Sequence, residues 1–200
     1  ATAAVDRVAD GMVVGLGSGS TAGHAIDALG AAVDEGLDIV GVPTSYQAAD
    51  RARAAGVPVR TLEDVAEVSI AIDGADQVAD GTLIKGGGGA HTREKVVDAT
   101  AEEFVVVVDP SKHADTLDAA VPVEVLPDAR RAVTRRLEGL GGQPTLRSAD
   151  AKSGPVVTDN GHLVLDVAFG PIADPAGVAL LVSTIPGVVG HGLFVDLADV

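Results

Sequence analysis

The chain of 200 residues contains no cysteine, and this absence removes several chemistries at once. Disulfides, thiol nucleophiles and thiolate metal sites are excluded. Aromatic residues are also scarce, at 2% of the sequence, whereas hydrophobic residues make up 46%. Because almost all of these are Ala, Val, Leu and Ile, we expect a globular protein whose core is packed with aliphatic side chains.

Long hydrophobic runs are missing as well. No apolar stretch reaches the length that spans a bilayer, and the opening residues, ATAAVDRVADG, do not form a basic segment followed by a long apolar one. We therefore expect no membrane partner, and the cytoplasm is the expected location.

Basic residues are few. Lys and Arg number 14 against 29 Asp and Glu, which gives a formal net charge of −15. Nucleic-acid phosphates are bound by concentrated Lys and Arg, and the sequence has no basic run, so we expect no nucleic-acid partner. A strongly acidic surface is typical of proteins that work in concentrated salt, and a halophilic source is the hypothesis that this composition favours.

The first two thirds of the chain alternate short β-branched runs with Ala-rich segments of helical length. We expect strands at residues 12–17, 37–44, 57–60, 68–76 and 104–109, and helices at 20–35, 45–55 and 91–102. Because these strands are nearly all apolar, the alternation predicts a parallel sheet covered on both faces.

The pattern changes in the last third. We expect strands near 123–125, 144–148 and 188–195, helices at 127–139 and 174–183, and a hairpin within 156–167, whose turn is Asp159-Asn160-Gly161. This βαββαβ order predicts a small ferredoxin-like α+β domain.

A glycine-rich stretch, VVGLGSGSTAGHAIDAL, follows the first expected strand and opens a helix. Its glycines permit a tight turn and close approach of a ligand, and its hydroxyl side chains can donate to a ligand or cap the helix. These hydroxyl residues are Ser18, Ser20 and Thr21. A helix N-terminus favours a phosphate, although an ordinary strand-to-helix turn is the structural alternative.

A nucleotide ligand is less well supported. Residues 17–22 fit the short pattern G-x-G-x-x-A, but the second expected strand ends in Val-Pro-Thr-Ser without the acidic residue that a ribose requires. The phosphate-binding pattern GxxxxGK[ST] is absent too. These features favour a simple phosphorylated metabolite.

Two carboxylates lie at the end of another expected strand. In AIDGADQV, Asp73 and Asp76 flank Gly74 at the carboxyl edge of the predicted sheet, which is where ligands bind in open α/β folds. The two acids could bind sugar hydroxyls, or the segment could be a plain Asp-Gly turn.

The stretch LIKGGGGAHTREK places a cation and a carboxylate on either side of four glycines. Lys85 ends an expected strand, and Glu94 lies at the start of a helix. A carboxylate base beside a fixed cation suits proton abstraction next to a carbonyl, because the cation stabilises the developing oxyanion. A glycine hinge with a solvated lysine and a helix-capping glutamate is the alternative.

Four segments in this order, GLGSGSTA, AIDGAD, LIKGGGGAHTREK and VVDPSK, resemble the ribose-5-phosphate isomerase family of the A type, and the later VEVLPDAR and IPGVVGHGLF also match. The resemblance implies a three-layer Rossmann-like α/β core at residues 1–118 and 193–200, and a ferredoxin-like domain at 119–192. It implies interconversion of ribose 5-phosphate and ribulose 5-phosphate in the pentose phosphate pathway, without cofactor or metal, by a homodimer or homotetramer.

The resemblance also assigns roles to residues. Glu94 would be the base that moves a proton between C1 and C2 through a cis-enediolate, and Lys85 would stabilise the enediolate charge. Asp73 and Asp76 would act in ring opening and on the sugar hydroxyls. Further implied substrate contacts are Ser18, Gly19, Ser20, Thr21, Gly74, Ala75, Gly86, Gly87, Gly88 and Lys112. The histidines are scattered without metal-binding spacing, and we assign His91 no role.

Two other classes of function stay open at this point. A non-catalytic sugar-phosphate sensor would need the phosphate loop but not the pair of Lys85 and Glu94, and it would normally carry a DNA-binding segment. An acyl-CoA transferase or a sugar-phosphate deaminase could share the architecture, and the former uses a glutamate as a nucleophile. The order of the four segments favours the isomerase.

The acidic composition yields a first prediction. The thermal unfolding midpoint should rise when potassium chloride increases from about 0.1 M to about 1 M, because the Debye length falls from about 10 Å to about 3 Å and repulsion between carboxylates is screened. Scanning calorimetry at the two concentrations measures the shift. Equal midpoints would contradict the halophilic hypothesis.

Overall fold

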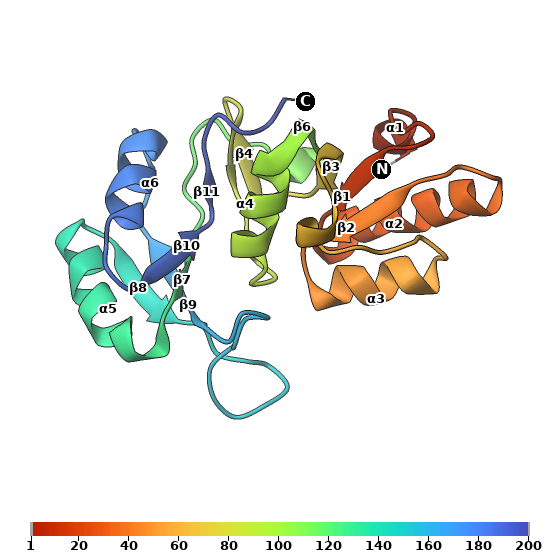
Figure 1. Ribbon diagram of the computed structural model, residues 1–200. Helices are drawn as coiled ribbons and strands as arrows, with labels where there is room; N and C mark the ends of the chain where they lie inside the picture. The colour runs from red at the N-terminus through yellow and green to blue at the C-terminus, as the bar shows by residue number, and fades with distance from the viewer. Residues whose placement is uncertain (1, 200) are drawn as a thin grey trace. The chain divides into compact units, whose positions relative to one another are not determined.

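The structure is a computed structural model that describes residues 2–199, and it divides into two compact units (Figure 1). The first unit comprises Ala1–Ala75, Arg93–Asp109 and Leu197–Val200, and the second comprises Asp76–Thr92 and Pro110–Asp196. The chain therefore passes between the units more than once. The domain boundaries expected at 118/119 and 192/193 stay a prediction.

The first unit contains the expected parallel sheet. Its strands are β1 (Val13–Leu16), β2 (Val40–Pro43), β3 (Val68–Asp73) and β6 (Ala101–Val106), in the order β2-β1-β3-β6. Both neighbours of β1 run parallel to it. Since β1 and β3 are almost entirely buried, their near-continuous apolar sequences are those of strands covered on both faces.

Helices cover the two faces of this sheet. The helices are α1 (Thr2–Val5), α2 (Gly19–Asp34), α3 (Tyr46–Ala54) and α4 (His91–Thr100). Side chains of α2 and α3, among them Ile26, Leu29 and Ala52, form one core cluster with alternate residues of β1 and β3. On the other face, α4 packs close to Gly15 of β1. A Cβ added to Gly15 would lie only 2.8 Å from Val97 Cγ1 of α4. Figure 1 shows α2 and α3 on one side of β1 and β3 and α4 on the other.

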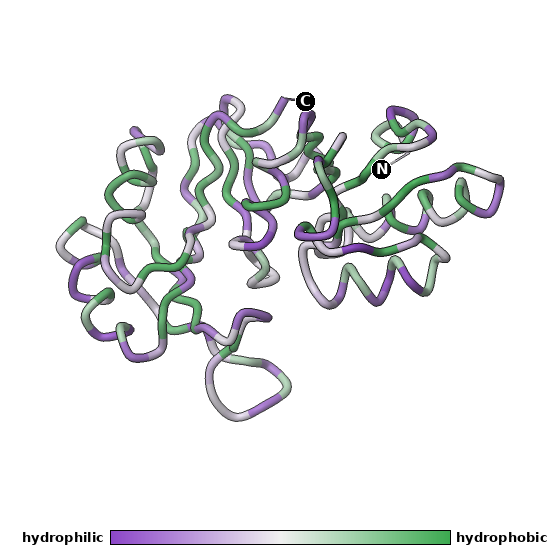
Figure 2. The backbone as a smooth tube through the Cα atoms, in the orientation of Figure 1, coloured by the Kyte–Doolittle hydropathy of each residue, from purple (hydrophilic) through white to green (hydrophobic). Residues whose placement is uncertain are grey.

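The second unit contains the expected βαββαβ order. Its elements are β7 (Val121–Val125), α5 (Arg130–Gly139), β8 (Gln143–Leu146), β9 (Leu163–Ala168), α6 (Pro175–Ser183) and β10 (Val188–His191). The antiparallel sheet has the order β10-β7-β9-β8, with α5 and α6 packed on it, and the ferredoxin-like prediction is confirmed. In Figure 2 the strands of both units are mostly hydrophobic, as strands that line a core should be.

The second unit also contains a small antiparallel sheet that was not predicted as a sheet, although strands were expected before Lys85 and across residues 193–194. It consists of β4 (Gln77–Ala79), β5 (Thr82–Ile84) and β11 (Leu193–Phe194), in the order β11-β5-β4. Asp80 and Gly81 form the β4–β5 turn with φ of 46° and 75°. Positive φ at both central residues fits a type I′ hairpin turn, for which an Asp-Gly pair is a strong sequence indication. This sheet positions the glycine-rich segment that follows β5.

Several strand predictions were wrong in extent. The expected strand at 188–195 divides into β10 and β11, which belong to different sheets. The expected strand at 57–60 is reduced to one bridge between Val59 and Gly41, because Pro58 has no N–H to extend a ladder. In the expected hairpin, only Val157 bridges to Leu163 before β9 begins. Short 3-10 helices occur at η1 (Leu62–Asp64), η2 (Pro110–Lys112) and η3 (Pro127–Ala129).

A buried carboxylate explains why the segment before β9 is irregular. Glu124 of β7 is fully buried, and its Oε1 accepts from Thr158 Oγ1 at 2.6 Å and Asn160 Nδ2 at 3.1 Å and lies 3.0 Å from His162 Nδ1. Burial acts to raise the pKa of Glu124, but the hydrogen bonds outweigh it and hold this pKa below its ordinary value. The turn residues thus bond to Glu124 instead of extending a ladder.

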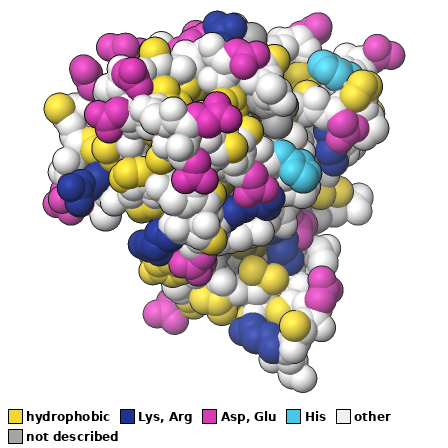
Figure 3. All heavy atoms as spheres, turned by 90° about the vertical axis from the view of Figure 1, so that its right-hand side faces the viewer, with side chains coloured by type: hydrophobic (Ala, Val, Ile, Leu, Met, Phe, Trp, Pro, Cys, Tyr) yellow, Lys and Arg dark blue, Asp and Glu magenta, His cyan; other side chains and the backbone are white. Residues whose placement is uncertain are grey.

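The surface agrees with the acidic composition. On the face drawn in Figure 3, acidic side chains are spread widely, and the basic ones lie among them without forming one continuous patch. Among residues 2–199, no helix combines the length and the apolar character that a membrane crossing needs.

The aliphatic core of the second unit yields a prediction. Leu137 of α5 is fully buried, whereas Leu180 of α6 is 67% exposed. Leu137→Ala should lower the free energy of unfolding by about 2 to 5 kcal/mol, because it removes buried methyl groups and leaves a cavity. Leu180→Ala, the matched control, should change it by less than about 0.5 kcal/mol. Urea titration measures both, and similar midpoints would show that the cluster around Leu137 does not stabilise the unit.

Candidate active site

The predicted site residues fall in both units. The first unit holds Ser18, Gly19, Ser20, Thr21, Asp73, Gly74, Ala75 and Glu94. The second unit holds Asp76, Lys85, Gly86, Gly87, Gly88 and Lys112.

The glycine-rich loop after β1 leads directly into α2. Ser18 occupies the N-cap position of α2, but its hydroxyl makes no cap hydrogen bond. Instead Ser18 Oγ lies 2.9 Å from Thr44 Oγ1 and 2.6 Å from Ser45 Oγ, at the end of β2. Ser45 is itself the N-cap of α3, since its side chain accepts from the Ala48 N–H. This hydroxyl cluster joins the starts of two helices.

The N-terminus of α2 is open to a ligand. Gly19 and Ser20 are exposed, and Gly19 adopts φ of 89°, a region that favours glycine. The Gly19 N–H donates to Gln47 Oε1 at 3.2 Å. Sequence reasoning missed Thr44, Ser45 and Gln47, because only the packing of β1 beside β2 shows that they meet the loop.

Asp73 lies against this loop at the end of β3. It is fully buried, and its Oδ1 accepts from the Ser18 N–H at 3.2 Å and from the Gly74 N–H at 2.7 Å. The approach is so close that a Cβ on Gly17 would lie 2.1 Å from Asp73 Oδ1 and 2.6 Å from Asp73 Cα. Glycine is therefore required at position 17 by the carboxylate beside it.

Glu94 belongs to the first turn of α4 and is only 5% exposed. Asp98, four residues later and therefore on the same side of the helix, is 2% exposed. The neighbouring Arg93 guanidinium lies 5.1 Å from the centre of the Tyr46 ring, a cation–π contact. Burial lowers the pKa of Lys95 to about 8. The first turns of α4 thus hold ionisable groups in a poorly solvated environment.

Lys85 directly follows β5 and is 2% exposed. Its ammonium lies 5.4 Å from the centre of the Phe194 ring, and its backbone N–H donates to Gly192 O at 2.8 Å. The pairing of β5 with β11 therefore fixes the strand that carries Lys85. A lysine with so little exposure contradicts the alternative of a solvated side chain at a glycine hinge.

The four glycines after Lys85 form a tightly held loop. Gly86 and Gly89 adopt φ of 106° and 75°. The Gly87 N–H donates to Asp76 Oδ2 at 2.7 Å, and Arg147 donates to the carbonyls of Gly86 and Gly87. The ring of buried His91 packs so closely that a Cβ on Gly86 would lie 2.6 Å from its Nδ1. Sequence reasoning assigned no role to Arg147.

The remaining predicted contacts occupy less defined places. Lys112 ends η2 and is half-buried, beside the bridge that joins His113 to Val78. Gly74 and Ala75 are half-buried directly after β3. In residues 2–199 no group of three or more His, Asp and Glu is arranged to hold a metal ion.

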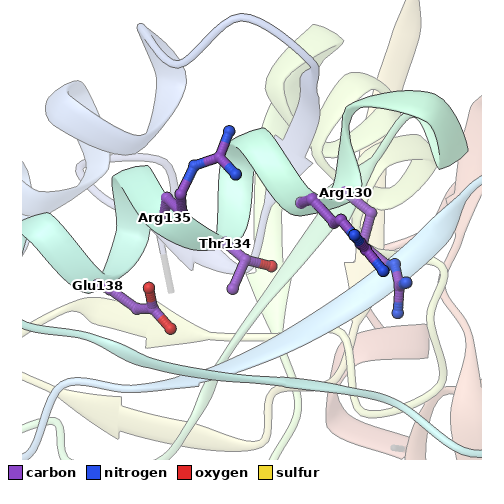
Figure 4. Close-up of a pocket in the computed structure, with 5 residues that line it drawn as sticks. Arg130, Thr134, Arg135 and Glu138 are labelled. Atoms are coloured by element: carbon purple, nitrogen blue, oxygen red, sulfur yellow. The ribbon is translucent and has the colours of Figure 1, made fainter.

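A surface cavity occurs on α5 of the second unit. It has a volume of about 360 Å³ and is lined by Arg130, Arg131, Thr134, Arg135 and Glu138 of α5 (Figure 4). None of the predicted site residues lines it. Its lining residues all belong to one helix and include none of the residues predicted to act on the substrate.

The contact between Gly17 and Asp73 yields a prediction. Gly17→Ala should lower the free energy of unfolding by about 1 to 3 kcal/mol, because the added Cβ overlaps the backbone of Asp73. Gly139→Ala is the matched control, since a Cβ there meets nothing within 4 Å at the end of α5. Urea titration measures both variants. Equal stability of the two would mean that the loop is not packed against Asp73.

A family model and curated relatives match this chain over most of its length. A sequence model of the family described as ribose 5-phosphate isomerase A (phosphoriboisomerase A) matches residues 40–200. The ribose-5-phosphate isomerase A of Natronomonas pharaonis is 62% identical over 196 residues, which cover 98% of this chain and 87% of the relative. That of Haloarcula marismortui is 60% identical over 196 residues and covers 98% and 86%.

Two solved structures are also similar. Ribose 5-phosphate isomerase A from Methanocaldococcus jannaschii has a TM-score of 0.94 and 46% identity, covering 98% of this chain and 88% of that one. A D-ribose-5-phosphate isomerase in complex with phospho-erythronic acid has a TM-score of 0.97 and 42% identity, covering 99% and 89%. The chain belongs to the ribose 5-phosphate isomerase A family.

Proposed function

We propose that this chain interconverts ribose 5-phosphate and ribulose 5-phosphate through an enediolate, with Glu94 as the base that moves the proton between C1 and C2. The observation that carries the proposal is the low exposure of Glu94 in the first turn of α4, in a chain of this family. A carboxylate shielded from bulk water can be held for proton transfer with the substrate, which is the role of a general base.

Lys85 stabilises the charge that the enediolate develops. Its 2% exposure places the ammonium in a region of low dielectric, where its attraction for an oxyanion is much stronger than in water. The Phe194 ring and the β5–β11 pairing hold the side chain in place before substrate binds. Such preorganisation avoids reorganisation cost at the moment of reaction.

The two aspartates act on the sugar hydroxyls and in ring opening. Asp73 is oriented by the N–H groups of Ser18 and Gly74, both of which bond to Oδ1. Asp76 is oriented by the Gly87 N–H, which bonds to Oδ2. Each carboxylate is therefore held through one oxygen by backbone donors.

The phosphate binds at the N-terminus of α2. The helix dipole and the exposed backbone of Gly19 and Ser20 favour an anion there, and the Ser18 and Thr21 hydroxyls are close to it in sequence. A phosphate oxygen would replace Gln47 Oε1 as the acceptor for the Gly19 N–H. Lys112, Gly74, Ala75 and Gly86 to Gly88 are proposed as further contacts to the substrate. The related isomerase bound to phospho-erythronic acid supports a phosphorylated, acidic sugar derivative as the kind of molecule recognised.

The sensor and transferase alternatives are less well supported. Relatives at 54 to 62% identity, which match 98% of this chain, carry the isomerase name. We further propose that the chain works in the cytoplasm as a homodimer or homotetramer, as the family resemblance implies. Light scattering after size-exclusion chromatography counts the subunits.

The proposed base is tested by Glu94→Gln, which keeps the shape of the side chain and removes its basicity. In concentrated potassium chloride with a chelator present, kcat for ribose 5-phosphate should fall by at least about a hundredfold, with a smaller change in KM. The matched control is Glu102→Gln, because Glu102 is exposed on β6. A folded Glu94→Gln protein as active as the control would exclude Glu94 as the base. An inactive parent chain would contradict the proposed function itself.

A further inference from the structure

Arg147 has hydrogen-bond partners on two sides, although no predicted role includes it. On one side its Nε donates to Asp166 Oδ2 at 2.9 Å and its Nη2 donates to Asp166 Oδ1. On the other side its Nη1 donates to Gly86 O at 2.8 Å and to Gly87 O at 3.0 Å. The side chain is 16% exposed. Bidentate pairing with a carboxylate fixes the plane of a guanidinium, so the direction of Nη1 is set by Asp166.

The backbone on both sides of this ion pair is anchored in the antiparallel sheet. Arg147 follows β8, its N–H donates to Val164 O at 3.0 Å, and its carbonyl accepts from the Val156 N–H at 2.9 Å. Asp166 lies within β9 and pairs with Thr145 of β8. The guanidinium therefore extends from a rigid sheet toward the glycine loop within the same unit.

The partners of Arg147 are peptide groups that would otherwise be free to rotate. The Gly86–Gly87 peptide has its carbonyl bonded to Arg147 and its N–H bonded to Asp76 Oδ2 at 2.7 Å. A trans peptide is planar, with its C=O and N–H pointing in opposite directions, so fixing the carbonyl fixes the direction of the N–H. Glycine on both sides places little steric limit on the rotation of this plane.

We propose that Arg147 is a positioning residue for the isomerisation, which orients Asp76 through the Gly86–Gly87 peptide, with Asp166 holding Arg147 in place. The inference rests on the proposed role of Asp76 in catalysis. If the peptide turned over, its carbonyl would face the Asp76 carboxylate and repel it, and the cation at Arg147 opposes that turn. Charge at both ends also polarises the peptide and strengthens both hydrogen bonds.

The arrangement requires arginine in particular. Four contacts use three separate nitrogens of one planar fork, two toward Asp166 and one toward both carbonyls. Lysine carries the same charge on a single nitrogen and cannot reproduce the fork. Arg147→Lys therefore removes the geometry and keeps the charge.

The test compares Arg147→Lys and Asp166→Asn with Arg51→Lys. Arg51 forms a bidentate pair with Asp27 in the first unit, is more exposed, and contacts no glycine loop, so it is a matched control. We expect Arg147→Lys to lower kcat by about ten- to a hundredfold, as small misplacements of catalytic groups do. KM should change by less than about threefold. Asp166→Asn should lower kcat in the same direction but less, and Arg51→Lys should leave it unchanged.

A double variant separates positioning from a general structural effect. If Arg147 acts through Asp76, adding Arg147→Lys to Asp76→Asn should lower kcat by less than about threefold further, because the group to be positioned is already disabled. Full multiplication of the two losses would overturn the proposal, as would an Arg147→Lys enzyme within about twofold of the parent in kcat.

Hydrogen exchange at the Gly87 amide gives a readout that does not depend on activity. The exchange should accelerate in Arg147→Lys and Asp166→Asn but not in Arg51→Lys, and unchanged exchange in both would overturn the proposal. Should Arg147→Lys not fold, Asp166→Asn carries the same comparison. If the parent chain does not isomerise ribose 5-phosphate, the proposed function fails, whereas faster Gly87 exchange would still show that Arg147 holds the loop.

Discussion

The close approach of Gly17 to Asp73 is the contact on which the first unit's part of the site depends. It exists because β1 and β3 pair in parallel up to their ends, where the Gly17 N–H donates to Ile72 O at 3.0 Å. With no Cβ between them, the Ser18 N–H reaches the Asp73 carboxylate and the Ser18 hydroxyl reaches β2 and the start of α3. The absence of a Cβ at Gly17 thus allows the ends of three strands and the starts of two helices to lie close together. A ligand site at the edge of a sheet needs such an arrangement.

The second unit uses glycine in a different way. Consecutive glycines carry a high entropic cost on ordering, and nothing in their own side chains selects one conformation. Selection comes instead from partners on rigid elements: Asp76 before β4, Arg147 after β8 and the His91 ring. The glycines alone would permit many loop conformations, and the surrounding residues select one. The backbone groups of the loop are therefore oriented by residues that are far away in the sequence.

The difference between these two uses of glycine also explains how much the sequence could predict. Most strands and helices of both units were predicted because apolar periodicity is local, and the place of Asp73 at the carboxyl edge of the sheet followed from the edge rule for parallel sheets. The β4–β5 hairpin was missed although Asp80-Gly81 indicated it. Arg147 could not have been found by spacing, since its loop partners lie about 60 residues earlier and meet it only through the fold. The catalytic roles of Glu94, Lys85, Asp73 and Asp76 stay predictions.

Each unit of this highly acidic protein buries ionisable groups. Asp73, Lys85, Glu94 and Asp98 are each at most 5% exposed, which is costly for folding in an aliphatic core and is characteristic of functional sites. Salt that screens repulsion among the surface carboxylates acts over a Debye length of about 3 Å at 1 M, and it reaches exposed pairs such as Arg51 and Asp27. Buried charges are screened far less. Concentrated salt can therefore stabilise the surface while the electrostatic interactions of the buried groups keep most of their strength.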